Sequence, residues 1–165
     1  MNLSPFEHCL CQRMASANPA LCEDQFTFSE KGKKVRLRPR KGEWVVAVAL
    51  DGCVFMDNNP RCDGLFLFCR RSHPVALLVE LKGMDITRAF EQLAYVTHQR
   101  SEYATIKTRL RECCRGRLQE KAVVVSSATL SEPKKEALEE DYGIRVVRVL
   151  HSEPTSKIPD VRDYL

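Results

Sequence analysis

The sequence predicts an α/β fold in which a central mixed sheet is flanked by helices. Apolar runs rich in β-branched residues and bounded by Gly, Pro and Asn indicate strands. Other segments repeat apolar residues at helical spacing, and the two patterns alternate along the C-terminal half. A chain of 165 residues suffices for one domain with its own core. We therefore expect a single domain over residues 1–165, with its core at about residues 44–150.

The first expected element is a helix over about residues 5–16. Ser4, Pro5 and Glu7 have the form of a capping box, in which Ser4 is the N-cap and Glu7 bonds back to it. Asn18 and the proline after it should end this helix.

Two short strands at residues 25–29 and 34–38 should form an N-terminal hairpin around a turn at 30–33. The hairpin carries the basic run KGKKVRLRPRK at residues 31–41, which has seven Lys or Arg in eleven positions and no acid. Such a run can neutralise the phosphates of nucleic acid, or it can be an ordinary solvated surface. The residues that would contact nucleic acid are Lys33, Lys34, Arg36 and Arg38.

Three strands should follow at residues 43–50, 62–70 and 75–82. The first of them, EWVVAVAL, is almost continuously apolar, as in a strand covered on both faces. Breakers at 58–60 and 72–74 separate the three. Their close connection predicts that they lie in one sheet.

Asp85 can cap the next helix, in which apolar residues recur at helical spacing. A second helical stretch is expected over 101–114. A strand, a helix and a strand should then follow at 121–126, 132–142 and 144–150, before an irregular tail.

The composition contains no membrane signal. No apolar run approaches the roughly 20 residues that a spanning helix needs, and the N-terminus lacks a signal-peptide pattern. We therefore expect a cytoplasmic protein without a membrane partner, and reduced thiols for its eight cysteines. Cys9, Cys11 and Cys22 lie near His8, but they contain no C-x-x-C pair, which favours inert thiols over a metal site.

Glu80 and Lys82 stand at the end of an otherwise apolar predicted strand. Side chains alternate along a strand, so both project from one face while Leu81 points to the other. Placing charges at the end of a covered strand costs desolvation free energy unless something pairs with them. An ion pair at the sheet end is the ordinary explanation, and a functional site is the alternative.

The position of Asp63 favours the explanation that Glu80 and Lys82 belong to a functional site. It begins the preceding predicted strand, and antiparallel pairing would bring it close to Glu80. Two carboxylates that close repel each other, and Mg²⁺ or Mn²⁺ would remove the repulsion. The expected metal ligands are Asp63, Glu80 and the backbone carbonyl of Leu81. Lys82 would orient or deprotonate a water that attacks a phosphate.

The motifs CDGLFLF (62–68), LLVELKG (77–83) and AFEQLAY (89–95) resemble those of the PD-(D/E)xK nuclease superfamily, which has the restriction-endonuclease-like fold. Asp63 matches its first acid, and Glu80 with Lys82 matches its E-x-K motif. The resemblance implies an αβββαβ core and metal-dependent phosphodiester hydrolysis.

Two further residues acquire roles from this resemblance. It implies that Gln92 binds substrate or organises the site, although an exposed helix residue is the alternative. Relatives often carry an acid on the first helix, which makes Glu7 a candidate metal ligand as well as a capping residue. Two positions depart from the pattern, because Cys62 replaces a proline and Tyr95 is one residue short of the Q-x-x-x-Y spacing.

Two functions from different classes follow. The favoured one is a Mg²⁺-dependent nuclease that acts on DNA, with the basic hairpin holding the backbone near the metal. The alternative is a catalytically inactive module of the same fold that binds nucleic acid or a partner protein. The complete set of Asp63, Glu80 and Lys82 favours the nuclease. A homodimer or a larger nuclease complex would let two sites cut two strands.

Overall fold

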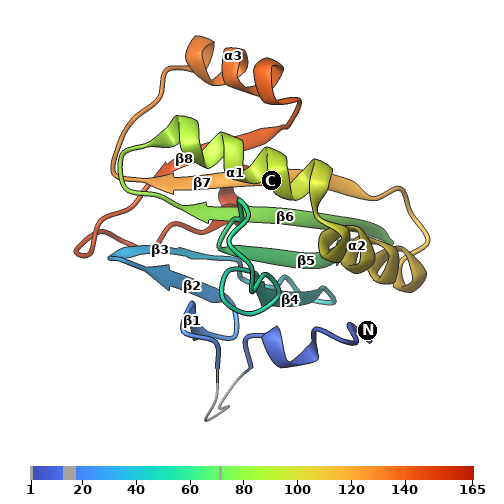
Figure 1. The fold of residues 1–165 in the computed structure, drawn as a ribbon. Helices are drawn as coiled ribbons and strands as arrows, with labels where there is room; N and C mark the ends of the chain where they lie inside the picture. The colour runs from blue at the N-terminus through green and yellow to red at the C-terminus, as the bar shows by residue number, and fades with distance from the viewer. Residues whose placement is uncertain (1, 13–17, 71) are drawn as a thin grey trace.

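A five-stranded mixed sheet organises the protein in the computed structural model, which describes residues 2–12, 18–70 and 72–165. Its strands, in spatial and sequence order, are β4 (Trp44–Ala49), β5 (Gly64–Arg70), β6 (His73–Leu81), β7 (Gln119–Ser126) and β8 (Val146–His151). β4, β5 and β6 are antiparallel neighbours, whereas β7 and β8 continue the sheet in parallel (Figure 1). The predicted class, a mixed sheet with helices, is confirmed.

A separate three-stranded antiparallel sheet is built by the N-terminal part of the chain. It consists of β1 (Cys22–Asp24), β2 (Thr27–Glu30) and β3 (Lys33–Arg36). Lys31 and Gly32 form the turn between β2 and β3 with positive φ angles of 47° and 77°, as a two-residue hairpin turn requires. The predicted hairpin is confirmed, whereas β1 was not expected.

Three helices cover one face of the large sheet. They are α1 (Ile86–Gln99), α2 (Ser101–Cys113) and α3 (Glu132–Tyr142). The Asp85 side chain caps α1 by accepting a 3.0 Å hydrogen bond from the Arg88 N–H, as the sequence predicts. Gly143 ends α3 in the left-handed region with φ 63°.

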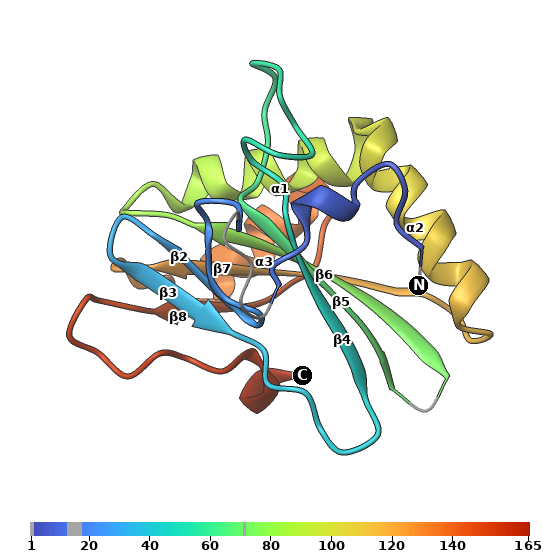
Figure 2. The same cartoon turned by 90° about the horizontal axis from the view of Figure 1, so that it is seen from below.

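The sheet has a core on each face because the side chains of its buried strands alternate. Leu65 and Leu78 pack with the helices, whereas Phe66 and Leu77 pack with the small sheet and the C-terminal segment. Figure 2 shows α1 and α2 on one side of the sheet and the C-terminal turn η2 (Val161–Tyr164) on the other.

The expected N-terminal helix is wrong for the residues that the structure describes. Only the 3₁₀ turn η1 (Glu7–Cys9) forms, and its N-terminus has no side-chain cap. The chain then extends along the edge of β4, where Cys11 donates a 2.9 Å hydrogen bond to the Ala47 carbonyl. Pairing with the open strand edge thus replaces helix formation, and residues 13–16 of the prediction lie outside the described part.

Four cysteines form two disulfides, contrary to the expectation of reduced thiols. Cys9 is bonded to Cys53, and Cys11 to Cys22. The fold brings the Cα atoms of these pairs to 5.6 and 5.5 Å, a separation that a disulfide spans, although their sequence separations of 44 and 11 give no hint of it.

Among the described residues, no helix combines the length and apolar character that crossing a membrane requires.

Candidate carboxylate and lysine site

Asp63 and Glu80 lie opposite each other at one end of the β5–β6 pair. The register pairs Gly64 with Val79, so the next step along both chains brings Asp63 to Glu80. Asp63 Oδ2 accepts a 2.5 Å hydrogen bond from the backbone N–H of Leu81. The antiparallel approach that the sequence predicts is therefore present.

The backbone of Asp63 is fixed by the end of β4. Its carbonyl accepts hydrogen bonds of 2.8 Å from the Leu50 N–H and 3.2 Å from the Asp51 N–H. The two carboxyl-bearing residues are almost fully enclosed, with Asp63 7% exposed and Glu80 2% exposed. Such enclosure is costly for two acids of like charge.

The pKa values of both carboxyls reflect this enclosure. Burial, reinforced by the charge of Glu80, raises the pKa of Asp63 to about 9, although the Leu81 N–H opposes the shift. Burial also raises the pKa of Glu80 to about 7, against the opposing effect of Lys82. Near neutral pH the pair therefore retains protons that a bound cation would displace.

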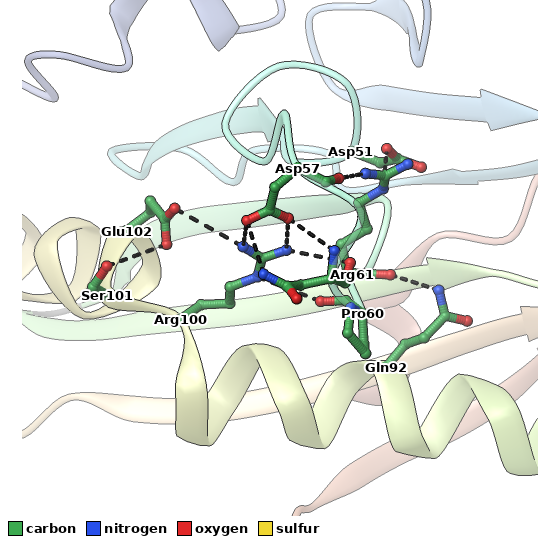
Figure 3. A network of polar contacts seen from close by, with 9 residues as sticks. Asp51, Asp57, Pro60, Arg61, Gln92, Arg100, Ser101 and Glu102 are labelled. Atoms are coloured by element: carbon green, nitrogen blue, oxygen red, sulfur yellow. Dashed lines mark hydrogen bonds and ion pairs between the residues drawn. The ribbon is translucent and has the colours of Figure 1, made fainter.

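Lys82 lies between Glu80 and α1. Its Nζ is 3.3 Å from Glu80 Oε1 and donates a 2.6 Å hydrogen bond to Gln92 Oε1. Gln92 in turn donates a 2.6 Å hydrogen bond from Nε2 to the carbonyl of Arg61, a contact visible in Figure 3. The Lys82 side chain is 22% exposed, so it is partly accessible to solvent.

One carboxylate oxygen in this cluster lacks a partner. Glu80 Oε2 is buried and has no hydrogen-bond partner in the described part of the chain. A buried acceptor left in this state is unusual and calls for a physical explanation. The oxygen donors of Asp63 and Glu80 are of the hard type that Mg²⁺ and Mn²⁺ prefer.

The donor set fits a cation that is bound by few protein ligands. Within the described residues, only His8, Cys9 and Cys53 form a group of three or more His, Cys, Asp or Glu ligand atoms that all lie within 4.8 Å of one another. Asp63 and Glu80 therefore belong to no group of that size in this part of the chain. Mg²⁺ is commonly held by one or two carboxylates and keeps several waters, so two acids suffice. The Leu81 N–H faces Asp63, and the carbonyl of a strand residue points to the same side as its N–H, which is consistent with Leu81 as a further ligand.

Glu30 is a third acid at the site, and no local sequence pattern places it beside Asp63 and Glu80. It ends β2, and its charge raises the pKa of both Asp63 and Glu80. The small sheet approaches β5 closely at Gly64, where the absence of a side chain leaves space for Phe28. A Cβ at Gly64 would lie 2.6 Å from the Phe28 ring. A hairpin pattern predicts β2 but not the surface on which it packs.

The loop between β4 and β5 is held by Arg100 at the junction of α1 and α2. Its guanidinium donates two 2.7 Å hydrogen bonds to the Asp57 carboxylate (Figure 3). The guanidinium carbon also lies 4.4 Å from the centre of the Phe55 ring. Arg100 is 5% exposed at its side chain. The Asp57 carboxylate also accepts a hydrogen bond from the Asn59 N–H. This anchor positions the loop that ends in Arg61, the partner of Gln92.

Three of the four predicted cations of the basic hairpin are engaged in ion pairs. Lys34 lies 2.7 Å from Glu23, while Arg36 and Arg38 lie 3.6 and 4.0 Å from Asp160. Lys33 pairs with Glu30 in the strand register and is half-buried. The basic residues thus contribute partly to internal charge balance.

Lys31, at the tip of the hairpin, interacts electrostatically with acids at and near the site. Its ion pair with Glu30 raises its pKa, and Asp63 and Asp51 contribute in the same direction. Its side chain is 88% exposed.

Glu7 is exposed in η1, and no described contact joins it to Asp63.

The structure therefore brings together Asp63, Glu80, Lys82 and Gln92 and adds Glu30. No family model, no curated protein and no solved structure that was compared with this chain matches it.

Proposed function

We propose that this protein is a metal-dependent nuclease of the PD-(D/E)xK superfamily that hydrolyses phosphodiester bonds in DNA. The observation that carries the proposal is the buried, partnerless oxygen of Glu80, which lies beside a second enclosed carboxyl and a lysine. A structural ion pair between Glu80 and Lys82 would account for one oxygen of Glu80. It would not account for Asp63 or for the second oxygen.

The free-energy cost of the cluster also supports a cation site. Two enclosed acids destabilise the fold when charged, and both have raised pKa values. A module that only binds a partner has no need for this arrangement, whereas a hydrolase uses it to hold Mg²⁺ or Mn²⁺. This argument favours the nuclease over an inactive module of the same fold.

The protein's own residues have separable roles in this reaction. Asp63, Glu80 and the Leu81 carbonyl hold the cation, which when bound stabilises negative charge on the phosphate. Lys82 Nζ has three hydrogens; it donates one to Gln92 and is close to Glu80, so a remaining one can contact an attacking water or a phosphate oxygen. Gln92 fixes the direction in which Lys82 extends.

The strand order supports assignment to the restriction-endonuclease-like fold. Three antiparallel strands, a helical segment and a parallel strand follow one another from β4 to β7. The superfamily core has this order after its first helix, and the described N-terminal residues supply only η1 in that place. The proposed assignment therefore depends on the sheet and the site.

Nucleic acid would reach the site beside the hairpin tip. The side chains of Lys31 and Arg38 on the hairpin are 88% and 67% exposed, and exposed cations can bind phosphates without sequence preference. We propose the cytoplasm as the compartment and a homodimer or a larger complex as the form that cuts both strands of a duplex.

A cleavage screen tests the proposal. The purified protein is incubated with labelled single-stranded, double-stranded and branched DNA and with RNA, in Mg²⁺, Mn²⁺ or chelator. We expect cleavage of at least one DNA that stops in chelator. Salt-sensitive binding without cleavage of any substrate would instead support the inactive module.

A further inference from the structure

We propose that His8, Cys9 and Cys53 bind one zinc ion after the Cys9–Cys53 disulfide is reduced. The ligand atoms of these three residues all lie within 4.8 Å of one another. They come from η1 and from the loop that follows β4, so the site would join the N-terminal segment to the large sheet. It shares no residue with the carboxylate site of Asp63 and Glu80.

The donor set selects the metal. One imidazole nitrogen and two thiolates form a borderline-soft set, which suits zinc and excludes Mg²⁺. Three protein ligands leave the fourth tetrahedral position to water or to an external ligand. Cys9 is buried, whereas His8 is exposed, so the metal can enter from the solvent side.

The backbone contacts around both cysteines do not depend on the disulfide. The Cys9 N–H donates to the Phe6 carbonyl at 3.0 Å, and the following residue, Leu10, forms a bridge with Val48 of β4. On the other side, the Cys53 N–H donates to the Leu50 carbonyl at 3.3 Å. Reduction therefore leaves two thiols held close together beside an imidazole.

The required movement of the sulfur atoms is small. Two thiolates on one zinc ion stand about 3.8 Å apart, given Zn–S bonds of about 2.3 Å and tetrahedral angles. The two Cα atoms are 5.6 Å apart. Rotation of the cysteine side chains can supply this separation without a shift of the backbone.

The chemistry balances with a dithiol as reductant. A dithiol donates two electrons and two protons to the Cys9–Cys53 bond, which gives two thiols and one oxidised, cyclic disulfide. Zinc then displaces a proton from each thiol, while neutral His8 supplies its free nitrogen. Thioredoxin and glutathione keep thiols reduced in the cytoplasm, the compartment proposed above, so zinc would compete with the disulfide there.

The second disulfide provides a matched control. Cys11 and Cys22 are also brought together by the fold, at a Cα separation of 5.5 Å. Within the described residues, no third ligand atom joins that pair in a group of the same size. The two pairs thus differ in the presence of the imidazole.

Zinc titration of the reduced protein against a chromophoric chelator tests the site. We expect one tightly bound zinc in the reduced wild type and in the Cys11→Ser/Cys22→Ser variant, and loss of that site in Cys53→Ser. His8→Ala should weaken binding by more than the roughly 10–100-fold that loss of an outer-shell partner costs. Co²⁺ in place of zinc should give thiolate charge-transfer absorption that requires Cys53.

Circular dichroism of each reduced variant separates loss of the site from loss of the fold. The proposal is overturned if the folded, reduced wild type takes up no zinc. It is equally overturned if folded Cys53→Ser or His8→Ala binds zinc as tightly as the wild type, or if the Co²⁺ absorption follows Cys11 and Cys22 instead.

Discussion

Lys82 Nζ donates a 2.6 Å hydrogen bond to Gln92 Oε1, which connects the end of β6 to the middle of α1. We predict that Gln92→Ala lowers kcat on DNA by about 10–100-fold with little change in KM, because Lys82 loses the partner that directs it. Gln99→Ala, at the exposed end of the same helix, should retain wild-type kinetics. A rise in KM alone would show that Gln92 binds substrate and does not position Lys82.

Stability without metal should depend on pH through Asp63 and Glu80. Their folded pKa values, about 9 and about 7, exceed the ordinary values of about 3.9 and 4.3, so the native state holds more protons than the unfolded state between these limits. Their contribution to the free energy of unfolding is complete below about pH 4 and is lost as the pH rises towards 9.

Denaturant unfolding of the metal-free protein between pH 5 and pH 9 measures this effect. We expect Asp63→Asn/Glu80→Gln to lose less stability than the wild type across this range, because neutral amides do not titrate. Asp141→Asn, an exposed acid on α3, should follow the wild type. Parallel curves for all three proteins would contradict the buried, protonated pair.

Glu30 should tune the pH at which metal binds. Its charge raises the pKa of Asp63 and of Glu80, so Glu30→Gln should lower both pKa values. Because metal ligands must lose their protons, Mn²⁺ binding followed by calorimetry should then begin at a lower pH. Glu136→Gln on α3 is the control for a general loss of charge. Weaker binding by Glu30→Gln at every pH would make Glu30 a ligand instead.

The close approach of Phe28 to Gly64 should make that glycine intolerant of a side chain. A Cβ there would lie 2.6 Å from the Phe28 ring, so we predict that Gly64→Ala lowers the free energy of unfolding by about 1–3 kcal/mol. Phe28→Leu in the same chain should recover part of this loss.

Gly83→Ala is the matched control for that substitution. Nothing lies within 4 Å of a Cβ at Gly83, and urea unfolding should show little change. If Gly64→Ala is as stable as Gly83→Ala, the small sheet does not pack on β5 in the manner described.

The sequence predicted the large sheet better than the N-terminal segment, for physical reasons. Buried strands and amphipathic helices carry local patterns, so β4 to β8 and the three helices could be predicted from residue periodicity. The capping-box pattern at Ser4 did not produce the expected helix, because the following residues pair with the open edge of β4. Edge pairing depends on tertiary structure and leaves no local pattern.

The residues of the candidate site likewise differ in whether a local sequence pattern predicts them. Asp63, Glu80 and Lys82 could be identified because strand alternation and antiparallel pairing follow from short motifs. Glu30 and Arg100 could not, since each acts across a contact between distant segments, as does the Cys9–Cys53 bond. Residues whose role depends on packing between elements require the three-dimensional structure.

The rate of DNA cleavage in Mg²⁺ by matched single variants shows whether Asp63, Glu80 and Lys82 form a metal-dependent catalytic site. We predict that Asp63→Asn, Glu80→Gln and Lys82→Ala remain folded and cut at least about 100-fold more slowly than the wild type, whereas Gln99→Ala cuts at the wild-type rate. Folded variants that cut as fast as the wild type, or wild-type cleavage that persists in chelator, would contradict it.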